Sequence, residues 1–287
     1  MKKLLALSLS MGLMVASFAG CGKSAQDAPK EKLTAKVIEV NLTEEEYAFG
    51  VDKAQPELLA STNEFIKQIM SDGTYDEICN KYFGDGTPTP VESATFDASK
   101  DQLVIATNAA FAPFEYMQGS SYVGIDMEIA KLLADHLGME LVIENMDFDA
   151  VCLSVGQHKA DIAMSGLTVK EDRKEYVDFT DTYYVASQKL IVLSTDTEFD
   201  ACQDAASVEA ILNSKDKLSK IGVQTGTTGQ FYCEGDADWG FTGLPLTTVG
   251  YKNGSLAVQD LLNGNINYVI IDAAPAKFIT EAINSVQ

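Results

Sequence analysis

The chain has 287 residues, of which 46% are hydrophobic and 22% are charged. This composition supports one large or two modest hydrophobic cores and excludes general disorder. The 42 acidic residues outnumber the 21 basic ones, which gives a formal net charge of −21. Such a surface repels nucleic acid and anionic lipid headgroups, so neither is expected as a partner.

The first 21 residues have the pattern of an export signal. Two lysines precede an apolar run over residues 4–18, and this run leads into Phe18-Ala19-Gly20-Cys21. The run is too short for a comfortable membrane span of about 20 residues, and its end resembles the lipobox of bacterial lipoproteins. We expect residues 1–20 to be a signal peptide, Cys21 to carry a lipid and residues 21–35 to be a flexible tether. A helical anchor that stays attached is the alternative.

The next segment predicts two strands followed by two helices. The expected elements are strands at 36–40 and 47–51, a helix from Pro56 to Asp72-Gly73, and a short helix at 75–82. About fifty residues of this kind cannot bury both of their faces alone, so they must dock on another part of the chain. Residues 85–101, which follow, are poor in core residues and are expected to form a linker.

From residue 101 onward the chain alternates apolar strands with amphipathic helices, which implies mainly parallel sheets covered by helices. Strands are expected at 103–107, 140–144, 162–165, 189–193, 221–224, 246–249 and 268–271. Apolar residues at three- and four-residue spacing predict helices around 125–137 and 256–262. The pattern indicates two consecutive α/β units, 102–186 and 187–287, joined by an extended stretch near residues 185–189.

Cysteine and histidine usage gives no sign of a metal site. Four cysteines follow the candidate lipidation site, namely Cys79, Cys152, Cys202 and Cys233, and their spacing matches no metal motif. The first two lie in helix-like apolar contexts and are expected to be buried thiols, whereas the last two either pair or, as we favour, stay free. The two histidines, His136 and His158, are far apart. No metal and no cofactor is therefore expected.

Several motifs in order resemble a known family. They are Thr107-Asn108-Ala109-Ala110-Phe111-Ala112-Pro113-Phe114-Glu115-Tyr116, Val123-Gly124-Ile125-Asp126, Met146-Asp147-Phe148-Asp149, Met164-Ser165-Gly166-Leu167-Thr168 with Glu171-Asp172-Arg173, Gly222-Val223-Gln224-Thr225-Gly226-Thr227-Thr228-Gly229 and Val269-Ile270-Ile271-Asp272. Together they resemble the polar-amino-acid-binding proteins of bacterial ABC importers, which are type 2 periplasmic binding proteins (solute-binding protein family 3). The resemblance implies an α/β fold of two lobes joined by a hinge of two extended strands.

The ending that is typical of this family is present, but it stands at the front of the chain. Residues 42–50 and 56–84 resemble the family's closing strand and helices. The resemblance therefore implies a circular permutation, with residues 36–41 as the hinge crossover, residues 42–84 as the displaced tail of lobe one, and Gln287 near Lys36. The alternative is a fusion of the tail of one binding domain to a truncated second domain.

The resemblance also implies a ligand site between the lobes. A free amino acid is a zwitterion, and each of its charges needs a fixed partner once it is buried. Arg173 suits the carboxylate because a guanidinium donates two parallel hydrogen bonds, and the turn that holds Thr227 and Thr228 precedes a helix and offers backbone N–H groups. Asp272, at the end of a strand, suits the ammonium group. Without the resemblance, Arg173 fits a solvated helix face and Asp272 fits a helix N-cap.

The remaining contacts expected from the resemblance fall into two groups. Ser165, Gly166 and Thr168 complete the polar shell, and Asn108, Phe111, Phe114, Phe148 and Gln224 select the ligand's side chain, although any of these phenylalanines could equally be core. Relatives that prefer basic amino acids often carry an acid where Asn108 stands. We therefore expect a polar neutral ligand, a cystine-like ligand or a broad specificity.

The function that follows is that of a lipid-anchored, extracytoplasmic receptor on the cell membrane. It is expected to be a monomer that closes on an amino acid, catalyses no reaction and delivers the ligand to the permease of an ABC transporter. The alternative is an enzyme similar to the cyclohexadienyl dehydratases, which share this fold. Such an enzyme requires a carboxylic acid of raised pKa in the cleft, and Glu115 and Glu144 are candidates by residue type. A sensory module is the third function considered.

Overall fold

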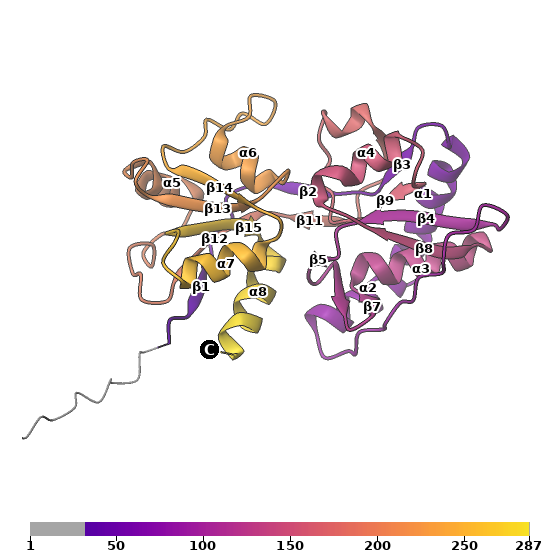
Figure 1. Cartoon of the computed structure of the whole chain (residues 1–287), viewed down its shortest axis with the longest axis horizontal. Helices are drawn as coiled ribbons and strands as arrows, with labels where there is room; N and C mark the ends of the chain where they lie inside the picture. Colours follow the sequence, from indigo (N-terminus) through magenta and orange to yellow (C-terminus); the bar gives the residue numbers. More distant parts are fainter. Residues whose placement is uncertain (1–31, 287) are drawn as a thin grey trace, which may run out of the picture. The chain divides into compact units, whose positions relative to one another are not determined.

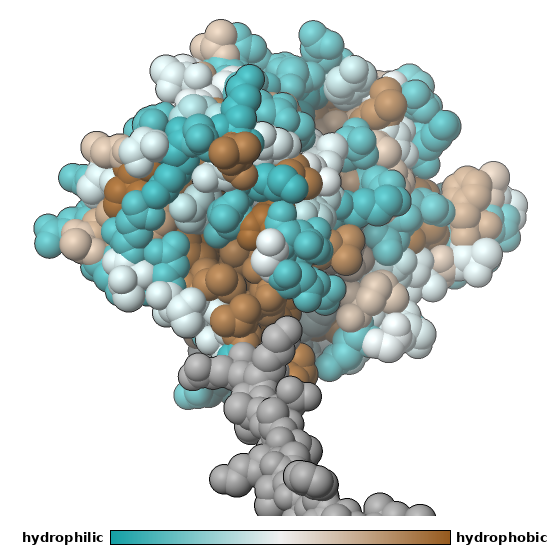
Figure 2. Space-filling view, turned by 60° about the vertical axis from the view of Figure 1, so that its left-hand side comes forward, coloured by the Kyte–Doolittle hydropathy of each residue, from teal (hydrophilic) through white to brown (hydrophobic). Residues whose placement is uncertain are grey.

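The computed structural model describes residues 32–286. The expected signal peptide, Cys21 and residues 22–31 of the tether lie outside the described residues. Among residues 32–286, no helix is long and apolar enough to cross a membrane. Figure 2 shows hydrophilic residues over most of the face that it presents, with smaller apolar areas between them.

One five-stranded sheet, of order β10-β3-β9-β4-β8, forms the centre of the first lobe. Its strands are β3 (Gly50–Asp52), β4 (Gln102–Thr107), β8 (Glu140–Asn145), β9 (Ile162–Ala163) and β10 (Val177–Phe179). As the strand and helix alternation predicted, β4 pairs in parallel with both β8 and β9. Four helices belong to this lobe, namely α1 (Pro56–Ser71), α2 (Thr74–Phe83), α3 (Ile125–Leu137) and α4 (Val151–Gly156) (Figure 1).

The second lobe is built on another five-stranded sheet, of order β1-β12-β15-β13-β14. Its strands are β1 (Ala35–Ile38), β12 (Gln188–Leu193), β13 (Lys220–Gln224), β14 (Thr247–Tyr251) and β15 (Tyr268–Asp272). Its helices are α5 (Ala205–Asn213), α6 (Thr228–Glu234), α7 (Gly254–Leu262) and α8 (Ala273–Ser285). The α/β fold class agrees with the sequence, but both sheets are mixed and not mainly parallel, because β1, β3, β10 and β12 pair antiparallel with their neighbours.

Two smaller sheets complete the fold. Strand β2 (Glu45–Tyr47) pairs antiparallel with β11 (Tyr184–Ala186), and Figure 1 shows both strands running between the two large sheets. In the first lobe, β5 (Ala110–Phe111), β6 (Glu115–Gln118) and β7 (Ser121–Val123) form a three-stranded meander. Two short 3-10 turns, η1 (Phe148–Ala150) and η2 (Arg173–Glu175), carry predicted site residues. The hinge therefore consists of two extended strands, as expected.

The crossover lies later in the chain than residues 36–41, where we expected it. Strand β1 pairs antiparallel with β12 in the second lobe, and apolar side chains as far as Leu42 are buried in the core of that lobe. The chain leaves this lobe only after Leu42 and crosses as β2. The expected strand over 47–51 is consequently divided, because Tyr47 ends the crossover strand while Gly50 begins β3 in a different sheet.

The front segment docks on the first lobe. Strand β3 lies between β10 and β9, and β9 pairs in turn with β4. Helix α1 begins with Pro56 in its first turn and ends at Asp72, as predicted, and it buries Phe65, Ile66 and Ile69 in the same core as β4. Burial of three such side chains is worth roughly 1.5–3 kcal/mol for each one. Residues 50–84 are thus an integral part of the first lobe, whereas residues 42–47, which were expected there as well, belong to the second-lobe core and the crossover.

Residues 85–101, the expected linker, run along the surface of the first lobe and are held by backbone hydrogen bonds. Val91 is buried and exchanges two such bonds with Tyr122 of β7, at 2.8 and 2.9 Å. Ala94 N donates to Leu141 O of β8 at 2.8 Å. One buried valine in a polar stretch is too weak a sequence signal to reveal this attachment.

The last described helix returns to the first strand. Asn284 in α8 accepts a hydrogen bond from Ala35 N at 3.0 Å and donates one to Ala35 O at 2.8 Å. Gln287 itself lies outside the described residues, but Asn284, three residues before it, lies beside β1. The four cysteines from Cys79 onward are all free, so Cys202 and Cys233 do not pair.

Candidate functional site

The predicted ligand residues come together from both lobes. The first lobe supplies Asn108, Phe111, Phe114, Phe148, Ser165, Gly166, Thr168 and Arg173, and the second lobe supplies Gln224, Thr227, Thr228 and Asp272. All of them except Phe148 are buried. We refer to this set as the interlobe site.

Hydrogen bonds across the lobe boundary connect these residues directly. Gln224 Nε2 donates to Asn108 Oδ1 at 3.1 Å, and Thr228 Oγ1 donates to Thr168 Oγ1 at 3.3 Å. The side-chain amide of Asn108 also donates to Met146 O at 2.6 Å, which fixes its orientation. The interlobe site is therefore a connected polar network in a closed arrangement of the two lobes.

Arg173 lies on η2 and is only 9% exposed. Its Nη1 donates to Thr168 O at 2.7 Å within the first lobe, and its Nη2 donates to Gly226 O of the second lobe at 3.1 Å. The guanidinium carbon is 5.2 Å from the centroid of the Phe148 ring, within range of a cation–π contact. The reading of Arg173 as part of a solvated face is therefore wrong for this residue.

A pocket of about 290 Å³ adjoins Arg173 at the lobe boundary. Its lining includes Phe148 and Leu167 from the first lobe and Gly226 and Phe231 from the second. The guanidinium forms part of its wall, so a small anionic group in this pocket would lie within reach of unused N–H donors of the arginine.

The turn before α6 faces this arginine. Gly226 has a φ of 80°, a left-handed conformation that a residue with a side chain rarely adopts. This conformation directs the Gly226 carbonyl toward Arg173, while Gly226 N donates to Gln230 Oε1 at 2.7 Å. Helix α6 begins at Thr228, and the Thr228 hydroxyl points to the first lobe. The turn therefore contacts Arg173 through the Gly226 carbonyl. The Gly226 N–H, one of the donors expected for the ligand, already donates to Gln230.

Asp272 ends β15 and is 5% exposed. It stands at the N-cap position of α8, but its side chain makes no capping hydrogen bond there. Instead, its Oδ1 accepts a hydrogen bond from Tyr47 OH on the crossover strand. Burial, reinforced by the nearby Glu45 carboxylate, raises the pKa of Asp272 to about 7. The side chain serves the interlobe site and not the helix.

Strand β2 contributes two site residues that the sequence reasoning missed. Glu45 and Tyr47 lie on the same face of the strand and are buried, whereas Glu46 between them is exposed. Glu45 Oε2 accepts a hydrogen bond from Thr168 Oγ1 at 2.8 Å, and its Oε1 accepts from Gln188 Nε2 at 2.9 Å. The alternation of Glu45 and Tyr47 was the available signal, but it gains meaning only when β2 is placed beside Asp272.

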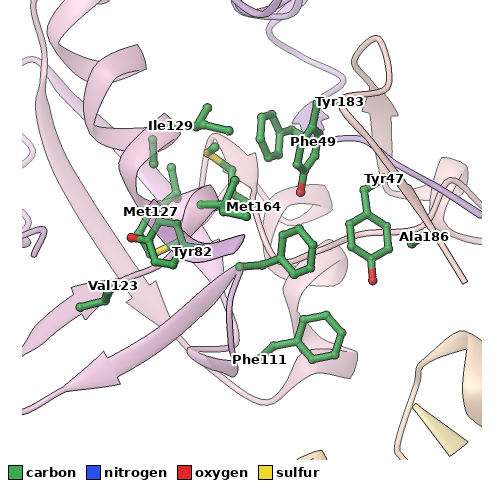
Figure 3. Close-up of a cluster of buried hydrophobic side chains, with 14 of the residues drawn as sticks. Tyr47, Phe49, Tyr82, Phe111, Val123, Met127, Ile129, Met164, Tyr183 and Ala186 are labelled. Carbon is green, nitrogen blue, oxygen red and sulfur yellow. The ribbon is translucent and has the colours of Figure 1, made fainter. Parts of the chain in front are cut away.

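Aromatic packing holds the first-lobe wall of the site. Phe114 is fully buried, with its ring centroid 5.2 Å from that of Tyr47 and 4.9 Å from that of Tyr184, both in edge-to-face geometry. Phe111 lies against Gly166, whose Cβ position would be 3.0 Å from the Phe111 ring. Figure 3 shows Tyr47 and Phe111 at one side of this aromatic cluster. Phe114 thus packs as core and orients Tyr47, whereas Phe111 borders the site.

Glu115 and Asp126 are two further buried acids of the first lobe that adjoin the site. Glu115 is fully buried, its Oε1 accepts from Ser165 Oγ at 3.0 Å, and its Oε2 has no partner among the described residues. Burial, followed by the charge of Asp126, raises the pKa of Glu115 well above its ordinary value. Glu144, the other acid considered for catalysis, is exposed.

Asp126 accepts hydrogen bonds from Gly166 N at 2.9 Å and from Tyr183 OH at 2.7 Å, yet burial raises its pKa from 3.8 to about 7. Between these two values the folded state keeps a proton that the unfolded chain has lost. The contribution of Asp126 to the free energy of unfolding is therefore complete below pH 4 and is lost as the pH rises to 7. The shift of about three units corresponds to about 4 kcal/mol.

Two α/β lobes joined by paired strands, with a polar site built from both lobes, define a two-lobed solute-binding protein. The chain belongs to the bacterial extracellular solute-binding proteins, family 3, whose family model matches residues 9–85 and 103–274. Both the fold class and the family expected from the sequence are thereby confirmed.

Two proteins of similar sequence are named as amino-acid-binding proteins. The chain is 34% identical to the arginine-binding extracellular protein ArtP of Bacillus subtilis, over 46% of this chain and 47% of the relative. It is 28% identical to the histidine-binding periplasmic protein of Salmonella typhimurium, over 64% of this chain and 65% of the relative. The chain thus spans between about half and two thirds of the length of these relatives.

Solved structures agree with the fold. One is an ancestral amino acid-binding protein, AncCDT-1, described as a precursor of cyclohexadienyl dehydratase, with a TM-score of 0.54 and 26% identity over 64% of this chain and 75% of that chain. Another is truncated ArgBP from T. maritima in its arginine-bound form, with a TM-score of 0.51 and 27% identity over 63% of this chain and 78% of that chain.

Proposed function

We propose that this chain captures a free amino acid outside the cytoplasm, closes around it and delivers it unchanged to the permease of an ABC importer. The observation that carries the proposal is that one interlobe site contains both a buried Arg173 and a buried Asp272. A zwitterion needs one cationic and one anionic partner when it loses water. The amino-acid ligands named for the relatives support the same ligand class.

The proposed binding step exchanges contacts within the protein for contacts with the ligand. In the closed structure, the Nη2 of Arg173 donates to the carbonyl of Gly226. A ligand carboxylate is a stronger acceptor than a neutral carbonyl, so it takes this donor when it enters. The ammonium group meets Asp272, and the two lobes rotate about β2 and β11 as they close.

The proposed ligand is a polar neutral or cystine-like amino acid, or one of a broad range. Asn108 and Gln224, which meet across the boundary, present amide groups to the ligand's side chain. The Gln224 Oε1 atom is buried and has no partner among the described residues. A buried acceptor without a donor is costly, and a ligand side chain that donates a hydrogen bond would satisfy it.

We also propose that Cys21 carries a lipid that holds a monomeric receptor on the extracytoplasmic face of the cell membrane. The lipobox-like sequence before Cys21 supports this part of the proposal. The circular permutation remains our explanation for the order of the segments. Its support is the place of β3 inside the first-lobe sheet and the contact of Asn284 with Ala35, which lie where a permuted chain needs them.

Isothermal titration of the chain from Gly22 with the twenty amino acids and cystine tests the capture function. We expect saturable binding of at least one amino acid, and mass spectrometry of the released ligand should find it unchanged. Binding of none of them contradicts the proposal. The Arg173→Lys variant is a matched comparison, because it keeps the charge but loses the planar pair of donors.

One observation favours a second function, that of an enzyme similar to the cyclohexadienyl dehydratases. Glu115 is a fully buried acid with a raised pKa and an unpartnered oxygen, which suits a general acid. Incubation with a cyclohexadienyl acid, followed by chromatography, tests this alternative. Product formation that the Glu115→Gln variant abolishes would establish it.

A further inference from the structure

Glu45 and Asp272 are two buried acids at the hinge, and we refer to them together as the acidic pair. Glu45 is 4% exposed and Asp272 is 5% exposed. The two are linked through Gln188, which donates to Glu45 and lies directly opposite Asp272 in the β12 and β15 register. The charge of Glu45 also acts on Asp272, where it adds to the effect of burial. The two acids thus belong to one electrostatic unit.

No basic side chain among residues 32–286 neutralises this pair. Of the ion pairs there, none includes Glu45 or Asp272. Arg173 donates to carbonyl groups, and Lys170 pairs with Asp172 and Asp236. Two ionised carboxylates in a buried site without a cation are strongly unfavourable, so the pair requires either a proton or a cation from outside.

A second observation points to a ligand at this position. Gln188 is fully buried, and its Oε1 atom has no hydrogen-bond partner among the described residues. This oxygen lies 3.0 Å from the position that a Cβ on Gly229 would occupy, at the start of α6. Gln188 thus brings an unpartnered acceptor beside the two acids, and an ammonium group supplies three donors.

We propose that Glu45 is a second acid of the ammonium subsite, and that the pair holds one shared proton when the site is empty and releases it when the ligand's ammonium group enters. This inference rests on the proposed capture of an amino acid. In the empty site the two carboxylates and one proton carry a charge of −1. With the ligand bound, two ionised carboxylates and one ammonium also carry −1, and one proton passes to the solvent. The exchange keeps the buried charge constant.

The groups around the pair agree with this exchange. Tyr47, whose own pKa is raised by burial, keeps its proton and donates to Asp272. Two other titratable groups, Glu115 and Tyr184, interact electrostatically with Asp272, and neither carries a positive charge. Thr43 and Thr168 donate hydroxyl hydrogen bonds to Glu45. Neutral donors therefore surround two acids.

Proton release on binding is measured by titration calorimetry in buffers of different ionisation enthalpy, with L-glutamine and L-arginine as probes. We expect close to one proton released per ligand at about pH 6, and less as the pH rises toward 9. Below about pH 7, the pKa of Asp272, the dissociation constant should fall about tenfold for each unit by which the pH rises. Glu45→Gln should bind more weakly and release fewer protons per ligand than the wild type, because burial alone then acts on Asp272.

Glu46→Gln is the matched control, because Glu46 is the exposed neighbour on the same strand, and it should behave as the wild type. Binding by the wild type without proton release overturns the exchange but leaves the capture function intact. A Glu45→Gln variant that releases as many protons as the wild type, or that folds normally but fails to bind, also overturns it. Failure of the wild type to bind any amino acid contradicts the capture function itself.

Discussion

Lys170 offers a test of whether closure of the lobes contributes to binding. It belongs to the first lobe, its side chain is 4% exposed, and its Nζ lies 3.0 Å from Asp236 of the second lobe. The same atom is 4.4 Å from the centroid of the Phe231 ring, also in the second lobe. Its bond to Asp172 lies within the first lobe, so it is the same in the open and closed states. Of the contacts that Lys170 makes, only those with Asp236 and Phe231 therefore favour closure.

We predict that Lys170→Ala weakens amino-acid binding about thirtyfold. A charge-assisted hydrogen bond to a partly exposed acid contributes about 1.5 kcal/mol, and the cation–π contact adds about 0.5 kcal/mol. Their sum of about 2 kcal/mol converts to that change in the dissociation constant. Because these contacts form only on closure, the ligand's off-rate should rise while the free energy of unfolding of the first lobe changes little.

Titration calorimetry and stopped-flow fluorescence measure the two effects. Lys174→Ala is the matched control, since Lys174 pairs with Glu171 in the first lobe and both are exposed. In a double-mutant cycle, Lys170→Ala should cost much less in an Asp236→Ala background. Equal losses in the Lys170 and Lys174 variants, or no loss in either, would refute the reasoning.

Three further predictions concern charge, pH and backbone geometry. Arg173→Ala should abolish binding in calorimetric titration, because it leaves the ligand's carboxylate buried without a cation, and Asp272→Ala should weaken binding strongly, because only Glu45 then remains for the ammonium group; ordinary affinity in both would show that the site is misassigned. Between pH 4 and 7 the wild type should lose about 4 kcal/mol of its free energy of unfolding through Asp126, and Asp126→Asn should not show this loss in denaturant unfolding. An unchanged pH slope in the variant would contradict the assignment. Gly124→Ala should lower the midpoint of thermal unfolding strongly, since Gly124 has a φ of 141° and a Cβ there would lie 2.0 Å from Phe114 O; a normal midpoint would count against this geometry.

Sequence patterns predicted the regular elements well because their causes are local. Pro56 and Asp72-Gly73 set the bounds of α1 through backbone conformations that neighbouring residues do not alter. The apolar runs of β4 and β15 reflect burial on both faces of a sheet. Arg173 and Asp272 were predicted from motifs, and the structure brings both into the interlobe site.

The crossover and the acidic pair escaped prediction because they depend on pairing between distant segments. Strand β1 belongs to the second lobe because it pairs with β12, which lies about 150 residues later in the chain. Glu45 appears in the sequence as one of three consecutive glutamates. Its burial follows from the pairing of β2 with β11, which turns Glu45 toward Thr168 and Gln188 and Glu46 toward solvent. No local pattern contains that information.

A crystal structure of the chain from Gly22, grown with the amino acid that binds in titration, tests the central claim most directly. The account predicts the ligand between the two lobes, with its carboxylate on Arg173 and the turn before α6, and with its ammonium group on Asp272. A ligand bound at another surface, or bound between the lobes with its two charged ends reversed, would contradict it.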